Sequence, residues 1–82
     1  MNELNAQRKL DLTGQICPWP VINTMRELKR MNAGEVVEVL IDHAPSVKNI
    51  PEAARRDGHQ IVNTAPLGDG IFRIIIRAER KV

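Results

Sequence analysis

The chain has 82 residues, of which 43% are hydrophobic and 27% are charged, and its formal net charge is +2. These values are typical of one globular domain, residues 1–82, whose core is modest because a chain this short buries only about 60–65% of its unfolded surface. A single cysteine excludes an internal disulfide and a C-x-x-C motif. Because neither a signal peptide nor a membrane-length apolar run is visible, we expect a cytoplasmic protein without membrane contact.

The first half of the chain predicts a strand, a helix and a second strand. Residues 1–8 are expected to form a flexible segment, and Leu10 and Leu12 alternate with polar residues in a short strand over residues 9–13. Gly14 permits a turn, and apolar residues then follow helical spacing from residue 18 to about residue 31. Gly34 stands where a helix ends, and residues 35–42 are rich in β-branched side chains, which favours a strand.

The second half predicts a short helix and a pair of strands. Prolines disfavour a long helix over residues 43–58. Asn49 and Glu52 resemble a capping box with Pro51 in the first turn, so we expect a helix over residues 50–57 that Gly58 closes. Residues 59–65 and 71–78 predict strands that the turn-rich residues 66–70 connect.

The predicted order is therefore β-α-β-α-β-β. Two helices can cover only one face of a four-stranded sheet, which predicts a two-layer α/β sandwich of the α+β class. Its first β-α-β unit should be a right-handed crossover between parallel strands.

The sheet face without helices would carry Ile71 and Ile75 between Arg73 and Arg77. Such aliphatic side chains can be the ordinary exposed residues of any protein surface, or they can form a docking surface or a homodimer contact. The arginines keep the face hydrated, which favours the first interpretation.

Cys17 lies between the first predicted strand and the first predicted helix, and prolines follow it at positions 18 and 20. Because a residue before proline avoids helical angles, we expect Cys17 at the N-cap and Pro18 at the first helical position. The helix dipole then lowers the pKa of the thiol, and only the amides of Trp19 and Val21 remain near the sulfur. A lone cysteine is commonly a small buried hydrophobic residue, but this position favours an exposed nucleophile.

Elimination narrows the reactions that Cys17 could perform. A dithiol oxidoreductase needs a second cysteine, and one cysteine with two histidines lacks the spacing of a metal site, so no metal is expected. Parallel strands end at one edge of a sheet, which could bring Asp42 and His43 near Cys17. No third group orients His43 as a base, so we interpret it as a loop residue and His59 as structural. What remains is a thiol that other proteins load and unload as a persulfide.

The stretch LDLTGQICPWPV resembles the L-D-x-x-G-x-x-C-P-x-P signature of the TusA/SirA family of small sulfur carriers. The resemblance continues through residues 28–42, 49–59 and 71–77 and so covers nearly the whole chain. It implies a fold like the C-terminal domain of translation initiation factor three, with sheet order 1-2-4-3 and an antiparallel last strand. By the same match Asp11 and Gly14 shape the loop, and Pro18 and Pro20 set the direction in which the sulfur leaves.

The resemblance also implies a function. Cys17 would accept persulfide sulfur from a cysteine desulfurase or a rhodanese-like donor and relay it to an acceptor protein. The pathways served by such carriers are tRNA thiolation, molybdenum cofactor synthesis and sulfur metabolism. The chain would thus be a sulfurtransferase-type carrier that uses no cofactor, and we expect a monomer or a weak homodimer.

Three departures from the family pattern leave the partner and pathway open. Many members have basic residues at the positions of Asn23 and Met25, and here only Arg26 remains of that group. The chain reads Asp-His-Ala-Pro at residues 42–45 where members often have Asp-Pro-Ala. Trp19 stands at a position that is acidic in the tRNA-thiolation carrier.

Trp19 can lie over the edge of the domain or anchor a partner, and its place beside the sulfur favours the anchor. The candidate docking or near-site residues are Trp19, Arg26, Asp42 and His43.

Two other functions stay open as alternatives. The late basic residues would suit a nucleic-acid-binding module, but one Trp, one Phe and no Tyr offer few platforms for base stacking, so we do not expect direct binding. A redox-regulatory adaptor would have its cysteine sensed by oxidation rather than loaded with sulfur.

Overall fold

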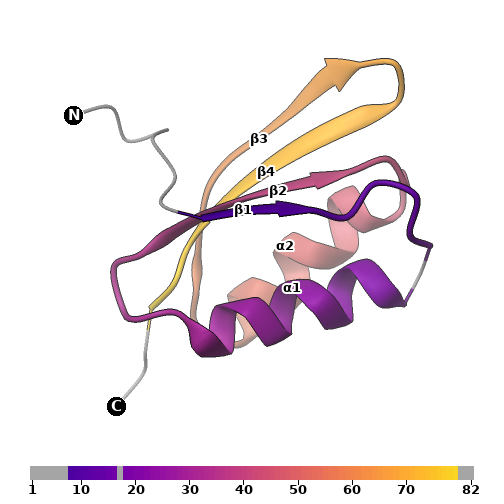
Figure 1. Cartoon of the computed structure of the whole chain (residues 1–82). Coiled ribbons are helices and arrows are strands. Elements are labelled where there is room, and N and C mark those ends of the chain that lie inside the picture. Colours follow the sequence, from indigo (N-terminus) through magenta and orange to yellow (C-terminus); the bar gives the residue numbers. More distant parts are fainter. Residues whose placement is uncertain (1–7, 17, 80–82) are drawn as a thin grey trace.

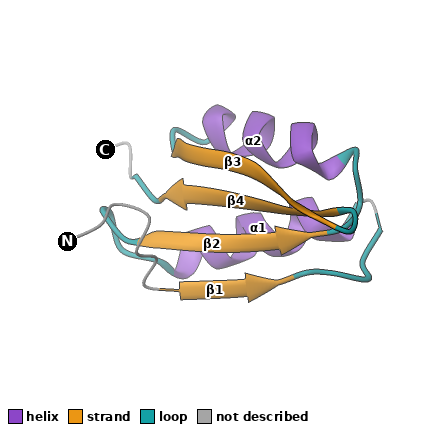
Figure 2. Cartoon of the chain, turned by 90° about the horizontal axis from the view of Figure 1, so that it is seen from above, coloured by secondary structure: helices purple, strands orange, loops and turns teal. Residues whose placement is uncertain are grey.

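The computed structural model describes residues 8–16 and 18–79, which form two strands and two helices in alternation followed by a β-hairpin (Figure 1). The elements are β1 (Arg8–Asp11), α1 (Trp19–Arg30), β2 (Val36–Ile41), α2 (Ser46–Arg56), β3 (Gln60–Gly68) and β4 (Ile71–Arg77). The sheet has the order β1-β2-β4-β3; β1 and β2 are parallel, and β4 is antiparallel to both of its neighbours. Both helices lie on one face of this sheet (Figures 1 and 2). The predicted fold class, element order and sheet order are confirmed.

The core lies between the helices and the two central strands. In β2, Val37, Val39 and Ile41 are fully buried, while the residues between them are half-buried, as the period of two in a strand requires. From β4, Ile74 and Ile76 join them. Full burial of one such side chain stabilises the fold by about 1.5–3 kcal/mol. The helices contribute the buried Leu28, Ile50 and Ala54, and Met31 follows the end of α1. Leu12 and Ala78, which follow β1 and β4, complete the core cluster.

The β-hairpin departs from the sequence prediction at its tip. Residues 66–70 were expected to form one loop, but β3 continues to Gly68 and the turn consists of Asp69 and Gly70. These two residues have φ angles of 56° and 76°, and two consecutive positive values are typical of a two-residue turn that matches the twist of a hairpin. Pro66 has no N–H to donate. It is tolerated within β3 because this strand lies at the edge of the sheet, so no neighbouring strand loses a hydrogen bond.

Helix α2 is longer than predicted, and the predicted capping box is wrong. The helix begins at Ser46, the residue at its N-cap is Pro45, no side chain caps it, and Pro51 lies inside it. Proline within a helix costs about 3 kcal/mol through its missing hydrogen bond. Here Ser46, Ile50, Pro51 and Ala54 are all buried, so the face of the helix that packs on the sheet outweighs the local preference. Neither of the described helices, α1 and α2, is long and apolar enough to cross a lipid bilayer.

The open face of the sheet is less exposed than the sequence suggested. Ile75 is only 1% exposed and Ile71 is half-buried, so the interpretation of these residues as ordinary exposed aliphatics is wrong for Ile75. Ile75 lies in register with Glu38 and Asn63 on the neighbouring strands. Arg73 precedes it on the same face, and long side chains of this kind cover apolar surface with their methylene groups.

The placement of the core predicts a stability difference between two aliphatic residues of the hairpin. Replacement of the fully buried Ile74 by alanine should lower the free energy of unfolding by about 2–5 kcal/mol, because it leaves a cavity in the core. Leu67→Ala is the matched control: Leu67 is 49% exposed, so its loss should change stability by no more than about 0.5 kcal/mol. Urea denaturation followed by circular dichroism measures both.

If Ile74→Ala does not fold, Ile74→Val should still fold and lose about 0.5–1.5 kcal/mol. Equal stabilities of the Ile74 and Leu67 variants would contradict the placement of the core.

Candidate functional site

The loop between β1 and α1 carries the single cysteine. Cys17 itself lies outside the described residues, so the predicted effect of the helix dipole on its pKa stays a prediction. Its predicted N-cap position is wrong, because the N-cap of α1 is Pro18. On the two sides of Cys17, Ile16 is 66% exposed, Pro18 is exposed and Trp19 is 54% exposed. The chain therefore reaches the protein surface immediately before and immediately after Cys17.

The loop begins with a local turn at the end of β1. The Leu12 amide donates to the Leu40 carbonyl at 2.8 Å, which continues the parallel pairing one residue beyond β1. A carboxylate oxygen of Asp11 then accepts bonds from the Thr13 hydroxyl at 2.6 Å and the Thr13 amide at 3.0 Å. Both bonds stabilise the carboxylate and so lower the pKa of Asp11, and the bond from the Thr13 hydroxyl has the larger effect. Gly14 follows with a φ of 87°, a left-handed conformation that favours glycine.

Asp42 holds the middle of this loop against the next strand. It directly follows β2, and its two carboxylate oxygens lie 3.0 and 3.1 Å from the amide nitrogen of Gly14, which donates to them. The sequence placed Asp42 at this edge of the sheet because parallel strands end on the same side. The structure thus brings Asp42 to Gly14, 28 residues away along the chain, in the loop that carries Cys17.

A second bond, which sequence reasoning missed, ties the loop to α1. The side-chain amide of Asn23 donates to the side-chain oxygen of Gln15 at 2.8 Å. Asn23 and Gln15 are polar residues that were expected to face solvent. No spacing or motif in the sequence indicates that they bind each other. The loop is therefore held at two neighbouring residues: Asp42 binds the amide of Gly14, and Asn23 binds the side chain of Gln15.

Helix α1 begins one residue later than predicted. Pro18 has a φ of −97° and occupies the N-cap rather than the first helical position, and the buried Pro20 lies within the first turn. The Trp19 amide donates to the Ile16 carbonyl at 3.0 Å, so this amide, which was expected near the sulfur, already has a backbone acceptor. No acidic residue lies in the first turn of α1, so the positive end of its dipole is not offset there.

The two histidines make contacts away from this loop. One ring nitrogen of His43, Nδ1, lies 3.1 Å from the Ser46 hydroxyl, which is buried at the start of α2. Nδ1 of His59 accepts a bond from the Glu79 amide at 3.0 Å, a contact that fits a structural residue. Thus the structure brings Asp42 to the loop and gives His43 a partner in α2.

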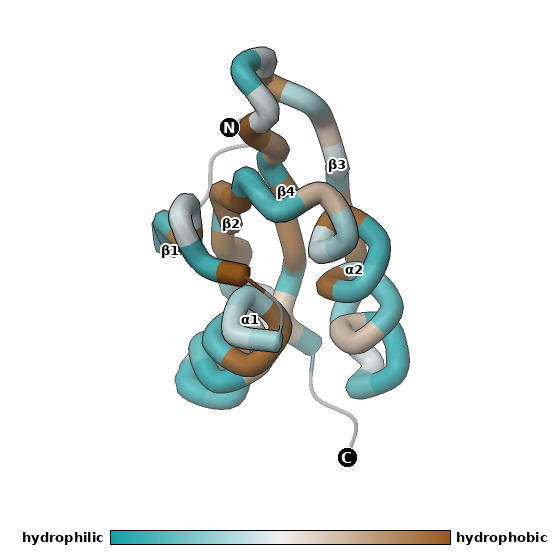
Figure 3. The backbone as a smooth tube through the Cα atoms, turned by 90° about the vertical axis from the view of Figure 1, so that its right-hand side faces the viewer, coloured by the Kyte–Doolittle hydropathy of each residue, from teal (hydrophilic) through white to brown (hydrophobic). Residues whose placement is uncertain are grey.

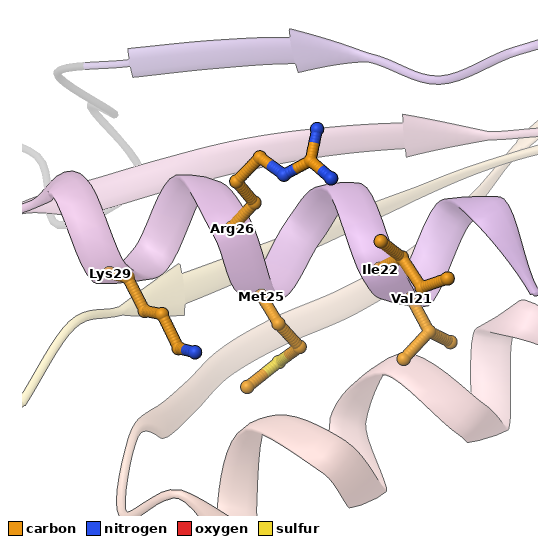
Figure 4. Close-up of a pocket in the computed structure, with 5 residues that line it drawn as sticks. All are labelled: Val21, Ile22, Met25, Arg26 and Lys29. Carbon is orange, nitrogen blue, oxygen red and sulfur yellow. The ribbon is translucent and has the colours of Figure 1, made fainter.

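The last candidate from the sequence, Arg26, is exposed on α1. It lines a surface groove together with Val21, Ile22, Met25 and Lys29 (Figure 4). The groove and the exposed Trp19 lie on the helix that starts beside Cys17.

The contact between Asp42 and Gly14 predicts that the loop loosens when the carboxylate is removed. In Asp42→Ala, the NMR order parameter of the Gly14 amide should fall from the rigid value of about 0.85 towards the flexible range below about 0.6. Glu52→Ala removes an exposed carboxylate from α2 and serves as the matched control. A Gly14 order parameter that is the same in both variants would contradict this role of Asp42.

The turn at Asp11 predicts a pH effect. Because folding lowers the pKa of Asp11, the turn contributes stability above the unfolded pKa of about 3.9, and this contribution is lost as pH falls through the folded pKa. Thr13→Val removes the hydroxyl donor and should raise the pKa of Asp11, whereas Thr13→Ser keeps the donor and should leave it low. A carboxyl NMR titration measures the pKa, and equal values in the two variants would refute the assignment.

Known proteins resemble the chain over most of its length. The model of the family described as sulfurtransferase TusA matches residues 8–78. Among similar proteins, a "Putative sulfur carrier protein" of Methanocaldococcus jannaschii is 42% identical over 72 residues, which are 88% of this chain and 95% of that protein. Another of the same description, from Archaeoglobus fulgidus, is 32% identical over 75 residues, 92% of this chain and 85% of that protein.

A solved structure shows the same architecture. The crystal structure of a SirA-like protein from Desulfitobacterium hafniense superimposes with a TM-score of 0.79 at 32% sequence identity. The match covers 89% of this chain and 99% of the other. Because the family model spans almost all of the described residues, and these relatives match over nearly their whole length, the chain belongs to the TusA sulfurtransferase family.

Proposed function

We propose that this protein carries sulfur as a persulfide on Cys17. It takes the sulfur from a cysteine desulfurase or a rhodanese-like donor and delivers it to an acceptor protein. The observation that carries the proposal is the exposure of Ile16 and Pro18, the two chain neighbours of Cys17, in a member of the TusA family. A sulfur that protein partners load and unload requires such a surface position.

The reaction is an exchange between thiols. The Cys17 thiolate attacks the outer sulfur of the donor persulfide; a new S–S bond forms on Cys17, the S–S bond of the donor breaks, and its electron pair remains on the donor thiolate. An acceptor thiolate then attacks the outer sulfur on Cys17 in the same way and regenerates the Cys17 thiolate. Neither step needs an external oxidant or reductant, because the oxidised sulfur atom moves between thiols.

The loop supports this chemistry in two ways. The free N-terminal end of α1, without acidic residues in its first turn, favours a thiolate over a thiol. The donors around the loop are already used: Asp42 accepts the Gly14 amide, and the Ile16 carbonyl accepts the Trp19 amide. Few donors then remain to hold the sulfur, which suits an atom that must be released as well as captured.

The chain has no second cysteine, so a persulfide on Cys17 has no thiol of the same chain to react with. It stays loaded until a partner thiolate arrives, which is the behaviour of a carrier. The reducing cytoplasm, where partner thiols stay free, is the compartment that fits this exchange. The acceptor would act in tRNA thiolation, molybdenum cofactor synthesis or sulfur metabolism.

Mass spectrometry tests the proposal. After incubation with a purified cysteine desulfurase and cysteine, the chain should gain about one sulfur mass, roughly 32 Da, and a thiol reductant should remove it. Cys17→Ser should gain no mass, because its hydroxyl cannot form the persulfide. The same gain in Cys17→Ser would refute Cys17 as the carrier residue, and a wild-type chain that neither a desulfurase nor inorganic polysulfide loads would refute the carrier function.

A further inference from the structure

A hydrogen bond between two side chains closes a ring of the chain around Cys17. The side-chain nitrogen of Asn23, Nδ2, donates to the side-chain oxygen of Gln15, Oε1, at 2.8 Å. The two residues are eight positions apart, and Cys17 lies between them in the sequence together with Pro18 and Pro20. We call this contact the ring-closing bond. It joins the segment before the cysteine directly to the helix that follows it.

Both partners of the ring-closing bond are anchored in the fold. The backbone amide of Gln15 donates to the carbonyl of Leu12, a residue that is only 3% exposed. Asn23 precedes Thr24 on α1, and Thr24 is fully buried. Asn23 and Gln15 are themselves half-buried, so their bond is partly shielded from the water that competes for exposed hydrogen bonds. The bond thus links two fixed points of the molecule across the cysteine.

The ring-closing bond restrains more of the segment than the backbone turn inside it. The Trp19 amide donates to the Ile16 carbonyl at 3.0 Å, which brings residues 16 and 19 together. This turn limits the local shape of the chain but leaves its orientation on α1 open. The ring-closing bond begins at Gln15, before the turn, and ends at Asn23, one helical turn after it. It therefore holds the turn against the helix.

The ring-closing bond adds no charge near the thiol. Both side chains are neutral amides, whereas a salt bridge at this place would put a charge two residues from a thiol that has to ionise. Salt screens exposed ion pairs but has little effect on a bond between neutral groups. The bond can therefore restrain the geometry of the segment without changing the tendency of the thiol to ionise.

Geometry decides the rate of this reaction because the attack on a persulfide is directional. The thiolate has to meet the outer sulfur of the donor in line with the S–S bond that breaks, and a misplacement of about 1 Å can cost about 100-fold in rate. A segment that turned freely on α1 would meet a bound donor in many orientations, most of them unproductive.

We propose that Asn23 is a positioning residue for sulfur transfer, which acts through Gln15 to hold the segment around Cys17 in the reactive orientation. The proposal rests on the function proposed for Cys17. The Cys17 thiolate attacks the donor persulfide, a new S–S bond forms, and the donor thiolate leaves with the electron pair of the broken S–S bond. Asn23 and Gln15 exchange no atom, proton or electron with the sulfur. They make a bound donor react faster without making it bind more tightly.

Single-turnover transfer separates positioning from binding. Asn23→Leu removes the donor of the ring-closing bond, keeps a side chain of similar size and favours a helix at least as well. With a purified cysteine desulfurase that already carries its persulfide, the rate constant at saturation should fall about tenfold. The carrier concentration at half-saturation should stay within about twofold of the wild type. Alkylation of Cys17 by iodoacetamide, a small reagent that needs no docked orientation, should also stay within about twofold. Mass spectrometry follows both reactions.

Gln15→Leu tests the same bond from its other end and carries the test if Asn23→Leu does not fold. It should lower the rate constant at saturation by the same factor. Asn23→Leu/Gln15→Leu should be no slower than either single variant, because the bond can be lost only once. Hydrogen exchange of the Asn23 side-chain amide, measured by NMR, should be faster in Gln15→Leu than in the wild type. The matched control is Asn49→Leu, the same change at a half-buried position of α2, which should transfer sulfur like the wild type.

Each other result overturns the positioning role. These results are a wild-type rate constant in either single variant, a loss confined to the half-saturating concentration, additive losses in the double variant, unchanged exchange of the Asn23 amide, and an equal loss in the α2 control. A parallel loss of alkylation would also overturn it, because the accessibility or ionisation of the thiol would then have changed. The same holds for a wild-type chain that polysulfide loads but the desulfurase does not. Failure of both to load the wild type would instead refute the carrier function, which distinguishes the two failures.

Discussion

The parallel pairing of β1 with β2 is the constraint on which the site depends. Parallel strands end at the same edge of a sheet, so the segment that follows β1 and the residue that follows β2 must meet there. The Leu12 amide extends the pairing by one bond, and Asp42 then reaches the Gly14 amide. A different strand order would leave Asp42 away from the loop, and Cys17 would lie on a segment with one restraint fewer.

The molecule separates a rigid part from a surface left available for partners. Figure 3 shows apolar residues along the central strands. Leu28 of α1 is buried in the same core cluster as these strands. The polar atoms of the loop bond mostly to one another or to the ends of nearby elements. Ile22 and Trp19 remain exposed on α1, the helix that follows Cys17 in the chain. Among the described residues, Arg26 and Lys29 beside them form no salt bridge.

The predictions from the sequence succeeded where a pattern repeats along an element and failed where a local signal competed with burial. The run of β-branched residues in β2 and the helical spacing in α1 located both elements to within one residue at each end. In α2, the prolines predicted a late start, but the helix begins at Ser46. Burial of Ile50 and Ala54 on the helix outweighs the hydrogen bond that is lost at Pro51. At Trp19, the sequence could not reveal that the Ile16 carbonyl takes the amide, because that bond depends on the angles at Pro18.

The sequence alone determined the class of fold and the family and predicts Cys17 as the reactive residue, since these follow from periodic burial and from residues that stand close together in a motif. Only the tertiary structure decided which groups meet across the chain: Asp42 with Gly14, Asn23 with Gln15, and the side chains that line the surface groove on α1. The physical reason is that hydrogen bonds act over about 3 Å, and the distance between residues far apart in sequence is set by how helices and strands pack.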